Sequence, residues 1–376
     1  MANNRIFYAC QMVGITKFGD DGAENAIREA HGVQSIGITT NFNLEQAFEL
    51  GQIQIYENIE GLPDVEVTME KVIDGYPLLY HLCTSGATNS SLTARSKARA
   101  DIRLGIYSDD EDFASGAPDV EVVCSGMYMS SVSYTIPVDG NATESVTLVG
   151  NHKNWLTNGH AAMRLSGIHT DEILGVDVPA AYTAQEGGVQ RRENVVMESS
   201  IFPATLQGIN SVGSSTGGGL NGNNVSSGVA TNAHVTSGSP LVHIQNVSIS
   251  TDFSREDILE LGRKTPYFRA PGFPIEVSCE IEAISTSGDF VNALETGDPA
   301  NDGTSAAGDN ITNDSIKIVL QDNTQFDLGT ANKLSSVSYG GGDATGGNVS
   351  SSYSYQNFNV LNVSSPYDPS FVVYPS

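Results

Sequence analysis

Val33-Gln-Ser-Ile-Gly-Ile-Thr-Thr-Asn-Phe-Asn-Leu-Glu-Gln-Ala-Phe-Glu-Leu-Gly51 has a close counterpart 211 positions later, Ile244-Gln-Asn-Val-Ser-Ile-Ser-Thr-Asp-Phe-Ser-Arg-Glu-Asp-Ile-Leu-Glu-Leu-Gly262. Extending the gap-free alignment to Pro63 and Pro274 gives eleven identities in 31 positions. Unrelated segments would share about two at ordinary residue frequencies. The peptide Ser-Ser-Val-Ser-Tyr recurs as well, at residues 130–134 and 335–339. The chain therefore contains an internal duplication.

Both copies have the pattern of β-strands. Residues 33–39 and 244–250 alternate apolar and polar side chains, which is the period of a half-buried strand. After each Gly-x-Pro, a second alternating segment begins at Val65 in one copy and at Ile275 in the other. Further strands are expected over residues 5–10, 102–107, 145–150, 195–202, 316–321 and 353–361. Short strands with turn-rich connections predict an all-β fold with short helices, as two tandem homologous antiparallel β-sandwich or barrel domains.

A short helix is expected inside each copy. Asn43-Leu-Glu-Gln46 and Ser254-Arg-Glu-Asp257 place a capping side chain three residues before a polar or acidic one, as at a helix start. Gly51 and Gly262 stand where a helix C-cap favours positive φ. The pattern predicts one to two amphipathic turns after the first strand of each copy.

The residues shared by the two copies are the candidate subunit-interface residues. In the predicted helices the glutamates lie four apart and share a face, so general acid–base chemistry is one interpretation, although it requires an apolar pocket and a partner. The favoured interpretation is that the phenylalanines and leucines dock the helix while the glutamates face solvent or a neighbouring subunit. These candidates are Phe42, Glu45, Glu49, Leu50, Gly51, Tyr56, Phe253, Glu256, Glu260, Leu261, Gly262 and Tyr267.

The duplication sets the expected domain boundaries. The first β-domain covers residues 1–155 and the second covers 190–376, with a linker at 156–189 that has room for one helix over 161–174. A Gly/Ser/Asn-rich insertion at 208–240 occupies the place that residues 13–32 fill in the first copy. We expect both segments to be long loops, which in compact domains are functional or mobile.

Composition narrows the function. Forty-four acidic and 18 basic residues give a formal charge of −26, and charged residues make up only 16% of the 376-residue chain. Proteins that grip nucleic-acid phosphates need clustered cations, so this class is disfavoured. No apolar run approaches the roughly 18 residues of a membrane helix, and the N-terminus lacks a signal-peptide core, so synthesis in the cytoplasm without a membrane partner is expected. The four scattered cysteines are expected to be reduced and mostly buried.

No catalytic constellation is recognisable. The seven histidines lack metal-ligand spacing, and neither a nucleophile elbow nor a phosphate-binding loop is present. We therefore expect no enzymatic activity, no cofactor and no metal. One alternative stays open: residues 298–309 partly resemble a calcium loop, with Asp298, Asp302 and Gly303 in suitable places, but Ala300 and Asp309 replace ligands that such loops use.

The run from Ser35 to Thr68, with Lys71-Val-Ile-Asp-Gly-Tyr-Pro-Leu-Leu-Tyr80, resembles tail tube proteins of tailed bacteriophages. The resemblance covers the first copy best and the second through the duplication. It implies β-sandwich or barrel domains that assemble into stacked six-fold rings around a channel for ejected DNA. With two such domains per chain, three chains would complete a trimeric, pseudo-hexameric ring.

The resemblance also implies the partners and the location. Expected partners are further copies of the chain, other tail proteins such as sheath or baseplate, a tape-measure protein in the lumen, and DNA in transient passage. The expected location is the virion tail, after synthesis in the host cytoplasm. An acidic lumen would repel phosphates and keep DNA moving.

Two alternatives remain. A baseplate, tube-initiator or tube-terminator protein would form one ring without stacking. A carbohydrate-binding module on the virion surface would need exposed aromatic side chains, for which the tyrosine-rich segment 353–374 is the candidate.

Overall fold

The computed structural model describes residues 6, 8–19, 27–51, 53, 55–107, 118–157, 188–197, 199–203, 206, 243–284, 313–340 and 347–365. Strands dominate this part of the chain and pair antiparallel, which confirms the all-β prediction. The helices are short: η1 (Tyr8–Cys10), α1 (Leu79–Cys83), α2 (Leu92–Arg95) and η5 (Arg192–Asn194).

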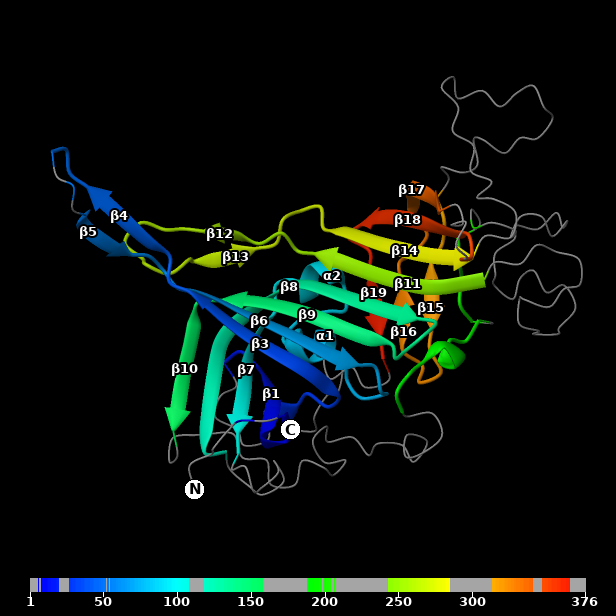
Figure 1. Ribbon diagram of the computed structural model, residues 1–376, viewed down its shortest axis with the longest axis horizontal. Helices are drawn as coiled ribbons and strands as arrows, with labels where there is room; N and C mark the ends of the chain where they lie inside the picture. The colour runs from blue at the N-terminus through cyan, green and yellow to red at the C-terminus, as the bar shows by residue number, and fades with distance from the viewer. Residues whose placement is uncertain are drawn as a thin grey trace, which may run out of the picture.

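The duplicated sequence folds into two equivalent sets of strands (Figure 1). We call the first set unit 1: β3 (Val33–Asn41), β4 (Leu44–Phe48), β5 (Ile55–Glu60), β6 (Asp64–Val72), β8 (Val120–Pro137) and β9 (Thr143–Gly150). Unit 2 repeats them as β11 (His243–Asp252), β12 (Glu256–Ile258), β13 (Phe268–Ala270), β14 (Glu276–Ile284), β17 (Lys333–Gly340) and β18 (Ser350–Phe358).

The equivalence extends to strand register. The β3–β6 ladder has a bulge at Gln34, and the β11–β14 ladder has one at the matching Gln245. Each of these glutamines donates from its side chain to the backbone carbonyl two residues earlier, at 3.3 Å. The β8–β9 and β17–β18 ladders share a second bulge, at Ser130 and Ser335. Bulges fix the register of a sheet, so the strands of the two units pair in the same order and register.

The predicted helices after β3 and β11 are wrong. Each segment is instead a projecting hairpin, the β4–β5 arm in unit 1 and the β12–β13 arm in unit 2 (Figure 1). Gly51 and Gly262 lie at the arm tips with φ of 93° and 86°, and positive φ suits a hairpin turn as well as a helix cap. At the base of the first arm, the Gly61 N–H donates to the Asn43 carbonyl at 2.8 Å.

Eight strands form one continuous sheet across the two units, in the order β17–β18–β14–β11–β8–β9–β6–β3. The order within unit 2 repeats the order within unit 1, so the units join head to tail. Strand β8 is long and turns at Gly126, which has a φ of 68°. Its first half pairs with β7 (Arg99–Ile106) and β10 (His152–Thr157), and its second half belongs to the eight-stranded sheet.

A second layer covers the apolar face of this sheet. Beneath unit 1 it contains α1, α2, β7, β1 (Gln11–Lys17) and β2 (Arg28–Glu29). Beneath unit 2 it contains β15 (Lys317–Val319), β16 (Gln325–Asp327) and β19 (Asn362–Ser364) (Figure 1). The buried apolar side chains form one cluster across both units; for example, the Tyr134 and Phe326 rings lie 4.6 Å apart.

Other expectations have mixed outcomes. The strands over 102–107 and 145–150 are confirmed as β7 and β9. Strands also form near 316–321 and 353–361, although β15 covers only 317–319 and β18 covers 350–358. The opening strand is displaced, since residues 8–10 are a 3₁₀ helix and β1 follows; residues 13–17, expected in a loop, belong to that buried strand. Among the described residues of 195–202, Val195 forms an isolated bridge with Leu320 and Ile201 forms one with Lys317, in place of the predicted strand.

Several predictions fall outside the described residues. These are the linker helix over 161–174, the insertion at 208–240 and the calcium-like loop at 298–309. The four cysteines are buried thiols, as expected.

Candidate assembly interface

The two units meet at an antiparallel ladder between β8 and β11. Asn246 to Asp252 pair with Pro137 to Ser131, and the backbone bonds continue beyond both ends. The Phe253 N–H donates to the Ser130 carbonyl at 2.8 Å, and the Val138 N–H donates to the Gln245 carbonyl at 2.7 Å. This junction therefore satisfies backbone groups that would otherwise lie on two open sheet edges.

Side chains at the end of β11 seal the junction. Phe253 is completely buried. The Arg255 guanidinium donates to the Met129 carbonyl at 2.8 Å through Nε and lies 5.2 Å from the centre of the Tyr128 ring. Burial lowers the pKa of Arg255 to about 10, which still leaves the side chain charged at neutral pH. Tyr128 also makes an edge contact with Phe268 of β13, with 5.9 Å between ring centres.

The base of the unit 2 arm is fixed to unit 1 by a charged bridge. Arg269 on β13 contacts Asp257 on the facing strand β12 at 2.9 Å and Asp64 at the start of β6 at 3.1 Å. Arg269 is almost fully buried, whereas Asp64 is half exposed. Since guanidinium groups form directional bonds to carboxylates, this bridge orients the arm relative to unit 1.

The outer edges of the eight-stranded sheet are the two strands equivalent to those at the junction. Within the described residues β3 pairs only with β6, and β17 pairs only with β18. In the repeat, β3 corresponds to β11 and β17 corresponds to β8. In the part of the chain that the structure describes, the sheet thus ends in the same two edges that it joins internally.

The predicted interface residues lie on or beside the arms. Glu45 on β4 and Glu256 on β12 are exposed, and so are Glu49 and Glu260; Glu260 lies 3.5 Å from Arg263. Leu50 and Leu261 are fully exposed at the tips, so the prediction that they dock a helix is wrong. Tyr267 is 66% exposed, with Arg263 5.7 Å from its ring centre. Tyr56 lies in β5.

The two phenylalanines of the motif have different environments. Phe253 is buried at the junction, whereas Phe42 is 65% exposed at the open edge. Of the two, Phe253 alone is buried, and it packs at a strand junction and not beneath the predicted helix.

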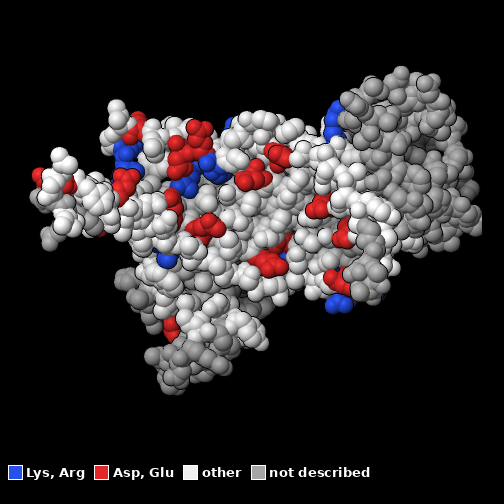
Figure 2. Space-filling view, turned by 45° about the horizontal axis from the view of Figure 1, so that its top comes forward, with Lys and Arg blue, Asp and Glu red and all other residues white. Residues whose placement is uncertain are grey.

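The uncovered face of the eight-stranded sheet is rich in hydroxyls and carboxylates. On β6, Val65, Val67 and Met69 are buried while Glu66 and Glu70 alternate outward. Strand β14 repeats this with outward Glu276 and Glu280, which accept hydrogen bonds from Gln356 and Ser352 at 2.7 and 2.6 Å. Acidic side chains are spread over the face seen in Figure 2, where several of the basic ones lie toward the arms.

A shallow groove crosses this face at the junction. Its lining is mostly serine and threonine from β8, β11 and β14, with Asp252 and Glu276 as its charged members. The groove contains no nucleophile–base pair. Hydroxyls on both sides of the junction therefore form part of the same polar surface as the outward carboxylates.

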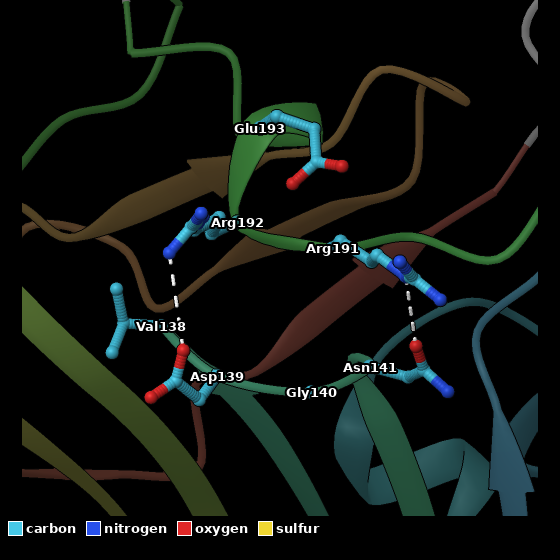
Figure 3. A pocket seen from close by; sticks show the side chains of 7 residues that line it. All are labelled: Val138, Asp139, Gly140, Asn141, Arg191, Arg192 and Glu193. Atoms are coloured by element: carbon cyan, nitrogen blue, oxygen red, sulfur yellow. Dashed lines mark hydrogen bonds and ion pairs between the residues drawn. The ribbon is translucent and has the colours of Figure 1, made fainter.

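A second pocket holds the paired arginines of the sequence (Figure 3). Arg191 Nε donates to the Asn141 amide oxygen at 3.0 Å, and Arg192 lies 3.9 Å from Asp139. Both contacts tie η5 to the turn between β8 and β9, so the arginines have structural partners. Within the described residues no three His, Cys, Asp or Glu side chains converge as metal ligands, and no helix is long and apolar enough to cross a membrane.

Sequence reasoning missed the residues that seal the junction, namely Tyr128, Met129, Arg255 and Arg269. The signal for their location was present, because the repeated Ser-Ser-Val-Ser-Tyr peptide marks β8 and β17. Pairing between distant strands is not encoded locally, so that repeat could not by itself identify the partner.

No model of a known protein family matches the sequence, and no curated protein matches it significantly. Solved structures give weak similarities. The tube-terminating cap of the anti-feeding prophage shares 14% identity over 42% of this chain and 94% of its own, with a TM-score of 0.30. A chain of the anti-feeding prophage baseplate shares 10% identity over 42% of this chain and 99% of its own, with a TM-score of 0.32. A chain of the sheath–tube complex of the PVC extracellular contractile injection system shares 11% identity over 41% of this chain and 93% of its own, with a TM-score of 0.30. TM-scores this low establish no function.

Proposed function

We propose that this chain is a structural protein of a phage tail, whose copies close into trimeric rings of six units that stack as a tail tube. The supporting observation is the head-to-tail joining of two equivalent units in one sheet, with the same two edges left at its ends. A heterologous contact of this kind repeats indefinitely, and it gives a ring where the rotation between units closes. The number six, and hence three chains, comes from the resemblance to tail tube proteins.

The uncovered sheet face is proposed to line the channel. Its outward charged side chains include Glu66, Glu70, Glu276 and Glu280. Carboxylates and hydroxyls on a channel wall repel phosphates and offer no cationic contacts, so DNA would traverse it without binding. This surface is consistent with the formal net charge of −26 for one chain, which amounts to −78 for three chains.

The role proposed is mechanical, without catalysis or a cofactor. A ring that does not stack, as in a baseplate, tube initiator or tube terminator, is the second candidate, because the same edges would serve it. The carbohydrate-binding alternative is less favoured: Tyr353 and Tyr355, two of its candidate aromatics, are buried and cannot stack on a sugar.

Electron microscopy of the purified full chain, combined with native mass spectrometry, tests the proposal. Long hollow tubes built from three-chain rings would support it, and lone three-chain rings would favour the second candidate. Rings of six chains would contradict the trimeric arrangement, and a protein that stays monomeric at high concentration would contradict ring formation altogether.

A further inference from the structure

We propose that β3 of one copy pairs antiparallel with β17 of the next copy, in the register that β11 makes with β8 inside the chain. The inference rests on the proposed function, in that copies meet in a ring, and adds the identity of the contact. Its basis is the internal junction, which displays these two edges already joined.

The repeat translates the internal register into an intermolecular one. Inside the chain Ser250 lies opposite Ser133, and Ile249 lies opposite Tyr134. The matching residues are Thr39 and Ile38 on β3, and Ser338 and Tyr339 on β17. Thr39 should therefore lie opposite Ser338 of the next copy, and Ile38 opposite Tyr339. The shared bulges at both edges hold this register, since a slip by one residue would turn every side chain to the wrong face.

Exposure of apolar groups at the two edges supports the pairing. At the internal junction Phe253 and Tyr134 are completely buried. Their counterparts at the open edges, Phe42 and Tyr339, are 65% and 51% exposed. Large apolar side chains that are buried in one copy of a repeat and uncovered in the other indicate a contact that the single chain leaves unmade. The pairing would cover both.

The side chains flanking the open edges are also complementary. Where the internal junction places Phe268 against Tyr128, the equivalent positions at the open edges hold Glu57 and Lys333. An edge contact between aromatic rings is thus replaced by opposite charges, both exposed. Leu44, 65% exposed, takes the place of Arg255, and Leu334 takes the place of Met129. The contact between β3 and β17 would therefore use other side chains than the β8–β11 junction does, while joining the equivalent pair of edges.

A charge exchange tests the flanking contact. Glu57→Lys and Lys333→Glu should each raise the concentration needed for assembly about fivefold, because each brings like charges together, and the double variant should restore it. Glu193→Lys is the control: it makes the same charge change at an exposed position of η5, which packs on the turn between β8 and β9, and should have little effect. If the double variant assembles no better than the single ones, the Glu57–Lys333 contact is overturned.

Cysteine pairs test the register. The variant with Thr39→Cys and Ser338→Cys should give covalent multimers on mild oxidation, since directly opposed Cβ atoms lie about 5 Å apart, whereas Thr39→Cys with Ser336→Cys is offset by two residues and should not. Ser133→Cys with Ser250→Cys is the internal positive control, which should close within one chain.

The outcomes separate the two proposals. If the variant with Thr39→Cys and Ser338→Cys forms tubes but no disulfide on oxidation, the register is overturned and the proposed function stands. Cross-linked open filaments without rings would support the strand pairing and contradict the proposed ring. A chain that forms neither assemblies nor cross-links would contradict both.

Discussion

Phe42 and Phe253 are the same residue of the repeat in two environments, and their truncation should have different costs. Phe253→Ala should lower the free energy of unfolding by about 3–5 kcal/mol, because a fully buried ring at the β8–β11 junction is lost. Phe42→Ala should change it by less than about 0.5 kcal/mol in the monomer and should impair assembly. Urea unfolding of dilute protein measures the first effect, and equal losses for both variants would argue against an unfilled junction at β3.

Glu144 predicts a pH dependence of stability. Burial raises its pKa from 4.5 to about 7, although its oxygens accept hydrogen bonds from the Leu79 and Tyr80 N–H groups at 2.6 and 3.0 Å. The folded state therefore holds this proton more tightly than the unfolded state. Its contribution is fully present below about pH 4.5 and is lost as pH rises toward 7, by about 3 kcal/mol in total.

The measurement compares wild type with Glu144→Gln, which cannot titrate. Between pH 5 and pH 8 the free energy of unfolding should fall more for wild type than for the variant. Parallel pH profiles would mean that Glu144 ionises normally in the folded protein.

At the scale of elements, the two arms are the features most exposed to partners. Leu50 and Leu261 are fully exposed at tips that project beyond the sheet (Figure 1). Because solvent-exposed leucines at matched positions indicate contact surfaces, we expect them to meet a neighbouring ring in the tube. The double variant Leu50→Ser, Leu261→Ser should shorten tubes in electron micrographs while leaving rings and the melting temperature unchanged. Val189→Ser, an exposed apolar position away from the arms, serves as the control; tubes of normal length in the double variant would exclude a role in stacking.

The arms also show where sequence reasoning reached its limit. Alternation along β6 and β9 was sufficient to predict strands, since one face is buried and the other is wet. The arm segments contain Leu, Glu, Gln and Ala, which favour helix locally, and a glycine that suits either structure. These segments form hairpins because β4 pairs with β5 and β12 pairs with β13. In β14 it is Val277, two residues after Ile275, that stands in the place of Val65, because the register depends on partners far along the chain.

At the scale of the whole molecule, the acidic sheet face predicts how a tube treats DNA. Replacing Glu66, Glu70 and Glu280 by Lys reverses three charges and changes the chain from −26 to −20. Tubes of this variant should retain short DNA fragments in co-sedimentation at low salt and release them as salt rises, since cationic contacts to phosphates are screened. Wild type and the corresponding Gln variant should retain none. Failure of the Lys tubes to bind DNA would indicate that this face does not line the channel.

Joining two units in one chain has a kinetic consequence. The β8–β11 junction forms within a single molecule, where its edges meet at the high effective concentration set by a covalent tether. In a ring of six units, three of the six contacts would thus be complete before any two molecules meet. Dilution can act only on the remaining three, so a small number of newly made chains would suffice to start a ring.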